Sequence, residues 1–163
     1  MQNTPTPITG RVVSVQASPE GGLPKPRLAE IHINTAGVDG DAHRDTQHHG
    51  GPDQAVCLFD METYRQLESE GMAVFPGAFS ENVTTEGLDF QALGPGWRLS
   101  LGESVVLEIT KVRVPCFKLT PIDARLPDGL VDRSGWMTRV LAEGTVRPGD
   151  PIRATAPEPV SGG

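Results

Sequence analysis

Residues 97–114 read WRLSLGESVVLEITKVRV, and this stretch decides the fold class. Two segments, Trp97 to Leu101 and Val105 to Val114, flank the short link Gly102-Glu103-Ser104. Three apolar residues of the return segment fall on one face: Val105, Leu107 and Ile109. Because this period of two is the pattern of a half-buried strand, and a short link containing glycine favours a tight turn, we predict a β-hairpin.

The same reading extends along much of the chain. We predict further strands at Arg11 to Ala17, Leu28 to Ile33 and Gln54 to Phe59. The last is a continuous apolar run, which is typical of a strand buried on both faces. The 19 glycines and 15 prolines divide the chain into short segments, which favours a barrel or sandwich over a helical bundle. The expected fold class is therefore mainly β.

Two segments have the character of helices. Met61 to Glu70 contains no helix breaker, follows Asp60 as an N-cap, and is ended by Gly71. Trp136 to Glu143 is the second prediction, with Gly144 after it, although its apolar residues fit a strand equally well. The mainly β fold is thus expected to carry a few short helices.

Length and charge exclude several classes of protein. With 163 residues the chain is the size of one domain. Its formal net charge of -7 and only three lysines argue against a general nucleic-acid binder, which gains affinity by neutralising phosphates. No apolar run approaches the ~20 residues that span a bilayer, and the start of the chain does not resemble a secretory leader. We therefore expect a cytoplasmic protein without a membrane partner.

The two cysteines, Cys57 and Cys116, have different surroundings in the sequence. They lie far apart and form no CxxC motif, so a zinc site or disulfide framework is not indicated. Cys57 lies inside the apolar run, where a thiol usually packs as a small hydrophobic group. Cys116 lies between Arg113 and Lys118, and nearby cations favour the thiolate. Cys116 is therefore the candidate for nucleophile, sulfur carrier or soft-metal ligand.

A glycine-rich polar stretch, Gly37 to Asp53, precedes the buried strand. Glycine allows backbone amides to approach an anion closely, so one interpretation is an anion-binding loop. Three histidines (His43, His48 and His49) and four aspartates (Asp39, Asp41, Asp45 and Asp53) could instead bind a divalent metal, although their spacing matches no closed zinc motif. A third interpretation is that these side chains only cap backbone donors in turns.

A second polar stretch, Phe79 to Leu88, contains Glu81 and Asn82 at the start of a possible strand. An amide there can exchange hydrogen bonds with a heterocycle or with a neighbouring loop. A surface hairpin would have the same sequence pattern, so this stretch gains meaning only in combination with the others.

Together these stretches resemble the MOSC family, named after the C-terminal domain of molybdenum cofactor sulfurase. The matching pieces are Gly37 to Asp41, His49 to Val56, Ser80 to Thr84, Arg113 to Leu119 and Arg139 to Asp150. The resemblance covers residues 10 to 153, which we expect to form the MOSC domain, with residues 1–9 and 154–163 as flexible termini. One departure is Ser80, which stands where the family often has glycine.

The resemblance implies a closed or partly open β-barrel of the pyruvate-kinase barrel type that binds molybdenum cofactor. Cys116 is at the position that in this family is proposed to ligate molybdenum or carry sulfur. Some members reduce N-hydroxylated compounds. The pyridoxal-phosphate domain of full-length sulfurases is absent, so pyridoxal phosphate is not expected. Without a ferredoxin-like cysteine cluster, electrons would come from a separate electron-transfer protein.

The resemblance also assigns roles, which we state as expectations. Cys116 is the catalytic residue and metal ligand, and the residues expected to contact the cofactor are His49, Gly50, Gly51, Asp53, Asn82, Arg113, Lys118 and Arg133. Of these, His49, Asp53 and Asn82 should converge on Cys116. The alternatives are a sulfur carrier that accepts a persulfide on Cys116 from a cysteine desulfurase, and a non-catalytic domain that binds a cofactor or a partner.

Overall fold

The computed structural model describes residues 8–20, 25–41, 52–113, 121–126, 128–130, 133 and 135–157. The elements, in chain order, are β1 (Ile8–Gln16), β2 (Arg27–Leu28), β3 (Ile31–Asn34), β4 (Gly37–Val38), η1 (Pro52–Gln54), β5 (Val56–Asp60), α1 (Met61–Ser69), β6 (Val83–Glu86), η2 (Phe90–Ala92), β7 (Arg98–Leu101), β8 (Val105–Val112), η4 (Asp128–Leu130), β9 (Trp136–Ala142), β10 (Gly144–Val146) and β11 (Pro151–Thr155).

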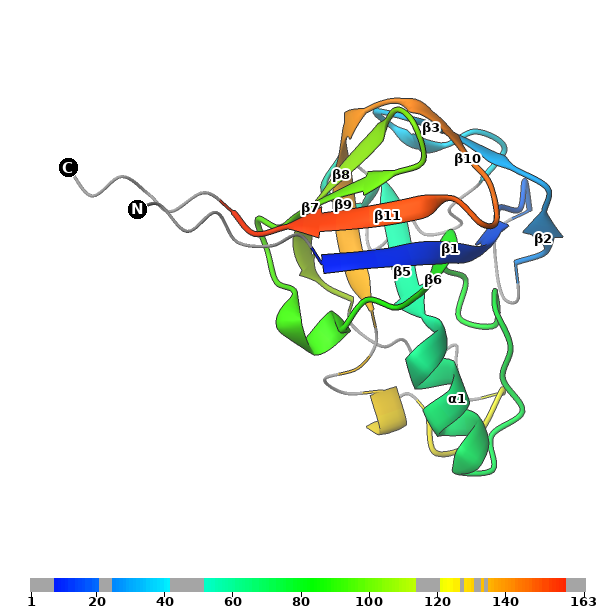
Figure 1. Cartoon of the computed structure of the whole chain (residues 1–163). Helices are drawn as coiled ribbons and strands as arrows, with labels where there is room; N and C mark the ends of the chain where they lie inside the picture. Colours follow the sequence, from blue (N-terminus) through cyan, green and yellow to red (C-terminus); the bar gives the residue numbers. More distant parts are fainter. Residues whose placement is uncertain are drawn as a thin grey trace, which may run out of the picture.

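In the described part of the chain, strands β11, β7, β8, β9, β5, β6 and β1 form a closed barrel (Figure 1). The ring closes because β1 also pairs with β11, where Ile8 lies opposite Ala154. Within this ring β5 and β6 are parallel, and α1 lies in the connection between them. Strands β10, β3 and β4 form a separate small sheet. The predicted mainly β barrel is confirmed.

The hairpin that decided the fold class is β7 and β8, with Leu101 opposite Val105. Gly102 begins the turn with a φ of 62°, a conformation that side chains disfavour. Its predicted inward face is buried, since Val105, Leu107 and Ile109 are each no more than 1% exposed. The hairpin prediction is thus correct in position and in the face it buries.

Strand β5 is buried on both faces, as predicted. Val56 and Leu58 pack in the barrel interior. Phe59 faces the other way and packs with Tyr64 of α1 and with Phe79, in a second apolar cluster. The ring centroids of Phe59 lie 4.6 Å from Tyr64 and 5.1 Å from Phe79. This second cluster attaches α1 to the outside of the barrel.

Helix α1 begins and ends close to the predicted positions. Asp60 is its N-cap and accepts a hydrogen bond from the Thr63 amide, while Glu70 is its C-cap. For Trp136 to Glu143 the helix is wrong and the strand alternative is correct, because residues 136–142 form β9. Strand β9 pairs with both β5 and β8, so tertiary pairing decided between the two patterns that the sequence allowed.

Two boundaries also differ from the sequence-based expectation. The segment Leu28 to Ile33 is divided between β2 and β3, and its first strand ends at Leu28. At the ends of the domain, β1 begins at Ile8 and β11 continues to Thr155, so the barrel includes four residues that were assigned to the termini. Ala154, one of these, is completely buried.

Candidate functional site

Part of the expected site lies in the described structure. Asn82, Asp53, Arg113 and Arg133 are described, whereas the predictions for Cys116, Lys118 and residues 49–51 lie outside the described residues. The site is therefore built from the residues that flank these segments, beginning with Asn82.

Asn82, immediately before β6, joins three segments of the chain. Its side-chain oxygen accepts a hydrogen bond from the Cys57 amide at 3.0 Å, and its own amide donates to the Cys57 carbonyl at 2.9 Å. Its side-chain nitrogen donates to Asp41 Oδ2 at 2.8 Å and to the Gln16 carbonyl at 3.2 Å. Asn82 is 1% exposed, and these bonds use its amide group within the protein.

Lys25 and Asp41 form a buried ion pair beside Asn82. The Lys25 Nζ lies 2.7 Å from Asp41 Oδ2, and the two side chains are 4% and 2% exposed. The other oxygen of Asp41 accepts a hydrogen bond from the Ser18 amide at 2.9 Å. A buried charge is tolerated when it is paired and hydrogen-bonded in this way. Asp41 is also the last described residue before the segment that contains His49.

Glu81, the residue before Asn82, belongs to a second buried group. The Tyr64 hydroxyl lies 2.8 and 2.7 Å from its two carboxyl oxygens, and the Thr84 hydroxyl donates to Oε2 at 2.8 Å. The Gly77 amide donates to the same oxygen at 3.1 Å. Burial, the charge of Glu81 and its hydrogen bond raise the pKa of Tyr64 well above its usual value. Gln16 extends the group by donating to Thr84 Oγ1 at 2.9 Å.

Cys57 lies at the centre of these charges. Burial raises the pKa of its thiol and is the largest effect. The charges of Arg113 and Lys25 lower this pKa, and the charges of Glu81 and Asp41 raise it. Arg113 and Asp41 thus both lie within electrostatic range of one sulfur atom. Since Asp41 precedes the His49 segment and Arg113 precedes the Cys116 segment, the two segments leave the described structure from the same region.

Gly135 positions Arg113, the residue after β8, close to β5. The Arg113 amide donates to the Gly135 carbonyl at 2.9 Å. Gly135 in turn lies so close to β5 that a Cβ atom would meet the Leu58 carbonyl oxygen at 2.2 Å. A glycine is needed for this approach, and through it the end of β8 is held against β5.

Ser80 supplies an unexpected feature of the turn before Glu81. Its φ is 65°, and among the described residues it is the only non-glycine residue with a positive φ. This is the position where the family often has glycine. The backbone therefore keeps the left-handed conformation although the side chain opposes it. Ser80 departs from the family pattern, yet the turn keeps a backbone conformation that glycine favours.

Asp53 and Arg133 lie with other partners. Asp53 is 69% exposed, and its Oδ1 lies 3.9 Å from Arg139 Nε. Arg133 donates to both carboxyl oxygens of Glu70 at 2.9 Å and to the Gly129 carbonyl at 2.6 Å. Among the described residues, neither forms a hydrogen bond or ion pair with Asn82. The predicted convergence of His49, Asp53 and Asn82 on Cys116 stays a prediction, because His49 and Cys116 lie outside the described residues.

The metal interpretation of the aspartates gains no support from the described residues. Asp39 accepts a hydrogen bond from Asn34, Asp41 pairs with Lys25, and Asp53 faces Arg139. Within the part of the chain that the structure describes, no three His, Cys, Asp or Glu residues are arranged to hold a metal ion. The three histidines and Asp45 lie outside it.

Sequence reasoning missed most of the residues that support Asn82. Lys25, Gln16 and Tyr64 come from three distant parts of the chain, and no local pattern connects them. The signals were the scarcity of lysine and the Glu-Asn pair itself. Neither identifies a partner, because the contacts are created by closure of the barrel.

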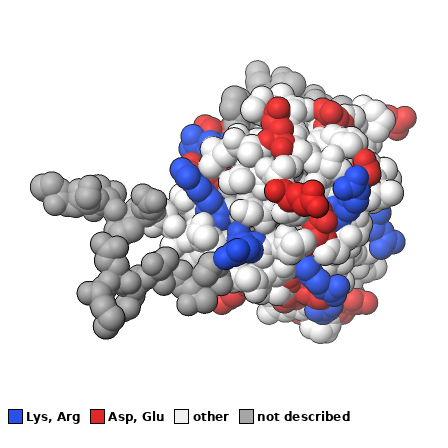
Figure 2. All heavy atoms as spheres, turned by 45° about the horizontal axis from the view of Figure 1, so that its top comes forward, with Lys and Arg blue, Asp and Glu red and all other residues white. Residues whose placement is uncertain are grey.

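The surface adds two observations. On the described part of the face in Figure 2, Lys and Arg side chains are interspersed with Asp and Glu and form no continuous basic patch. No helix among the described residues is long and apolar enough to cross a membrane.

Comparisons with known proteins concern the same region of the chain. The family model described as "MOSC domain" matches residues 45–153. Protein YiiM of Escherichia coli (strain K12) is 28% identical over 158 residues, which cover 90% of this chain and 70% of YiiM. The uncharacterized protein YflK of Bacillus subtilis (strain 168) is 32% identical over 134 residues, 79% of this chain and 60% of YflK.

A third relative carries a functional name. A protein named "Reductase" from Gibberella moniliformis (strain M3125 / FGSC 7600) is 29% identical over 172 residues. The match covers 93% of this chain but only 30% of that protein. The chain thus spans less than a third of this relative and 60% of YflK.

Solved structures have the same architecture. The crystal structure of YiiM from Escherichia coli matches with a TM-score of 0.69 and 25% identity, covering 93% of this chain and 71% of that one. The structure of the YuaD protein from Bacillus subtilis matches with a TM-score of 0.78 over 93% of this chain and 98% of that one. At 16% identity, the second likeness concerns the fold alone.

Proposed function

Because the chain belongs to the MOSC domain family, we propose that it binds molybdenum cofactor with the Cys116 thiolate as a ligand to the metal. We further propose that it is an oxidoreductase acting on N-hydroxylated compounds. Reduction of an N–O bond in this way takes up two electrons and two protons and releases water. The cofactor would supply the electron-transfer chemistry, and the protein would bind and orient it.

The observation that carries the proposal is geometric: Asn82 links Asp41 to Cys57 by hydrogen bonds, and the Arg113 amide donates to Gly135, which lies against Leu58. The segments with His49 and with Cys116 begin directly after Asp41 and Arg113. A soft thiolate suits a sulfur-rich metal centre, and an arginine suits a phosphate group. Arg113 is therefore our candidate for the cofactor phosphate, together with Lys118 from the segment that follows it.

The described residues that we expected to contact the cofactor have different partners within the protein. Asn82 already uses its amide within the protein, so we assign it the role of fixing Cys57 and Asp41. Arg133 is held by Glu70 and Gly129, so its expected cofactor contact would compete with these partners. Among the described cations considered for the cofactor, Arg113 is the one whose charge reaches the region around Cys57.

The relative named "Reductase" supports the oxidoreductase half of the proposal. It is much longer than this chain, so the activity remains our proposal for the matched domain. The sequence has only two cysteines, too few for an iron–sulfur cluster with four cysteine ligands. A separate electron-transfer protein is therefore proposed as the electron donor.

The test is to express the full chain in cells that make the cofactor and to measure molybdenum and pterin per protein. We expect molybdenum in the wild type, its loss in Cys116→Ser, and its retention in the matched control Cys57→Ser. Equal metal in Cys116→Ser would remove Cys116 as the ligand. A persulfide on Cys116 after incubation with a cysteine desulfurase, in protein without molybdenum, would instead support the sulfur-carrier alternative.

A further inference from the structure

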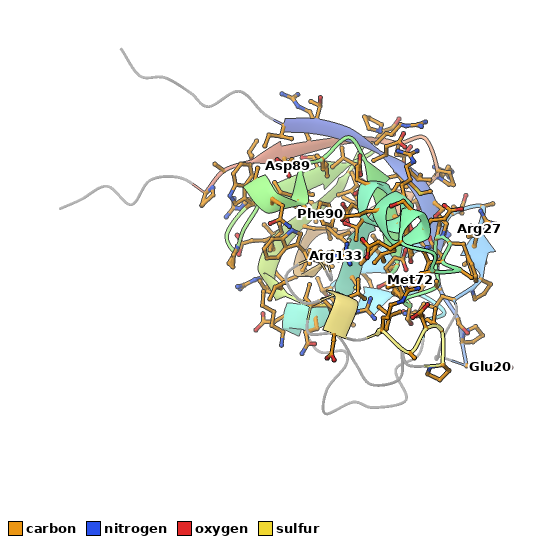
Figure 3. The ribbon with its side chains drawn as sticks, turned by 90° about the horizontal axis from the view of Figure 1, so that it is seen from below. Glu20, Arg27, Met72, Asp89, Phe90 and Arg133 are labelled. Atoms are coloured by element: carbon orange, nitrogen blue, oxygen red, sulfur yellow. The ribbon has the colours of Figure 1, made fainter. Side chains whose placement is uncertain are left out.

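A groove of about 1400 Å³ lies at the lower end of the barrel, away from the β7–β8 turn. It is bounded by the start of α1, by η2 and by the adjoining ends of β8 and β9. Figure 3 views this end, where Phe90 lies between Asp89 and Arg133 in projection. The volume is ample for a small organic ligand.

One part of the groove is apolar. Phe90 of η2, Trp136 of β9 and Val112 of β8 line it. Trp136 donates its indole N–H to the Phe90 carbonyl at 3.3 Å, which links β9 to η2. Val112, at the end of β8, is 45% exposed. The apolar part of a ligand in the groove would cover this surface, and the removal of apolar surface from water would favour binding.

Carboxylates form the polar part of the groove. Asp60, Glu62 and Asp89 line it. Asp60 accepts a hydrogen bond from Thr63, Asp89 accepts one from the Gln91 amide, and Glu62 accepts one from the Gly87 amide after β6. Within the described residues, no lysine or arginine forms an ion pair with any of these three carboxylates.

The two arginines of the groove do not balance this charge, because each is paired with a carboxylate that is not part of the lining. Arg65 shares Glu86 with Arg11, and Arg133 is held in a two-pronged pair with Glu70. The three carboxylates of the described lining also outnumber its two arginines. The start of α1 adds only about half a positive charge. The carboxylates of the described lining therefore leave the groove with a net negative charge.

We infer that this groove binds an organic cation, namely a protonated amine on an aromatic or aliphatic body. The ammonium group would lie against Asp89 and Glu62, and the body against Phe90, Trp136 and Val112. The carboxylates favour such a cation over its neutral counterpart through charge, and the half-buried Trp136 and the exposed Val112 offer apolar contact to its body.

Val112 lines the groove, and in the sequence Cys116, proposed to carry the chemistry, follows it by four residues. We therefore assign the groove to the substrate, which makes basic, amphipathic compounds the preferred substrate class. This assignment rests on the proposed function, whereas binding of the cation does not.

The experiment measures binding of 2-phenylethylammonium to the full chain by NMR titration, with neutral 2-phenylethanol as the matched ligand. We expect the amine to bind about tenfold more tightly than the alcohol, and salt to weaken only the amine. In the double variant Glu62→Gln/Asp89→Asn the two affinities should converge. Both replacements keep a side-chain oxygen for the backbone amides that the acids cap.

Two further variants complete the test. Glu103→Gln, in the turn at the other end of β8, removes one charge away from the groove and should leave both affinities unchanged. Val112→Ser should weaken the amine and the alcohol alike. Absence of saturable amine binding, equal affinities in the wild type, or full amine affinity in the double variant would each overturn the inference. Loss of the proposed cofactor would leave these results unaffected, so the two proposals fail separately.

Discussion

Cys57 and Asn82 exchange two hydrogen bonds: the Cys57 amide donates to the Asn82 side-chain oxygen at 3.0 Å, and the Asn82 amide donates to the Cys57 carbonyl at 2.9 Å. This double contact ties the start of β5 to the residue before β6. It makes Asn82 the residue on which the described part of the candidate site depends.

Replacing Asn82 by Ala should lower the free energy of unfolding by about 2 kcal/mol, because buried partners lose their hydrogen bonds. Hydrogen exchange of the Cys57 amide should accelerate more than that of neighbouring strand amides. Urea unfolding and amide exchange measure the two effects. Asn34→Ala, at a more exposed amide, is the control and should cost less. An unchanged exchange rate at Cys57 would contradict the assignment.

The Lys25–Asp41 pair should show strong coupling. Lys25→Met leaves the Asp41 carboxylate buried without its cation, so we expect a loss of about 3 kcal/mol. Asp41→Asn keeps an oxygen for the Ser18 amide, and combining it with Lys25→Met should recover part of the loss. A double-mutant cycle from urea unfolding gives the coupling energy. Strictly additive losses would show that the two charges do not interact.

The protein should be more stable with glycine than with alanine in place of Ser80. Both variants lose the hydroxyl group, so their difference isolates the cost of a positive φ, which is about 1 kcal/mol. Ser69, at the end of α1, is the control because alanine is favoured over glycine within a helix. The order of the two replacements in thermal unfolding should therefore be opposite at the two serines. The same order at both would show that Ser80 is not strained.

The thiol of Cys57 should react slowly in the folded protein. It is 7% exposed, and burial raises its pKa, so both access and the thiolate fraction are low. The Cys116→Ser variant, in which Cys57 is the only cysteine, should be labelled by a thiol reagent much more slowly than the Cys57→Ser variant. The same comparison in denaturant should give similar rates. Fast labelling of Cys57 in the folded state would contradict its burial.

Asp60 and Asp123 should affect stability with opposite dependence on pH. Burial raises the pKa of Asp60 above 3.8, so its contribution to stability is fully present below that pH and is lost as pH rises through the raised pKa. Relative to Asp60→Asn, the wild type should therefore lose stability with rising pH.

Asp123 provides the control of opposite sign. Hydrogen bonds from Arg125 lower its pKa from 3.8 to about 2, so its contribution is present above 3.8 and is lost as pH falls through about 2. Relative to Asp123→Asn, the wild type should gain stability with rising pH. Urea unfolding between pH 2 and 7 measures both differences. Parallel trends for the two aspartates would contradict the assigned causes.

Local patterns predicted the elements that local sequence determines. The hairpin of residues 97–114, the buried run at Cys57 and the capped helix after Asp60 each have a complete signature within a few residues. Residues 136–142 do not, since their apolar positions fit a strand or a helix, and pairing with β5 and β8 settled the choice. Local sequence cannot supply that information.

The candidate site divides in the same way. Asn82 was predicted as a cofactor contact, which stays a prediction, whereas the structure shows that its amide group binds Cys57 and Asp41. Lys25 could not be predicted, because its partner lies on another loop and only the folded barrel brings them together. The predicted convergence of His49, Asp53 and Asn82 on Cys116 stays a prediction.

The pairing of β1 with β11 also sets an order of events during synthesis. Ile8 belongs to β1 and its partner Ala154 to β11, so the ring cannot be completed until β11 has left the ribosome. Until then the sheet has open edges, which are able to pair with other chains. Completion of the last strand is thus the step that protects the nascent protein from aggregation.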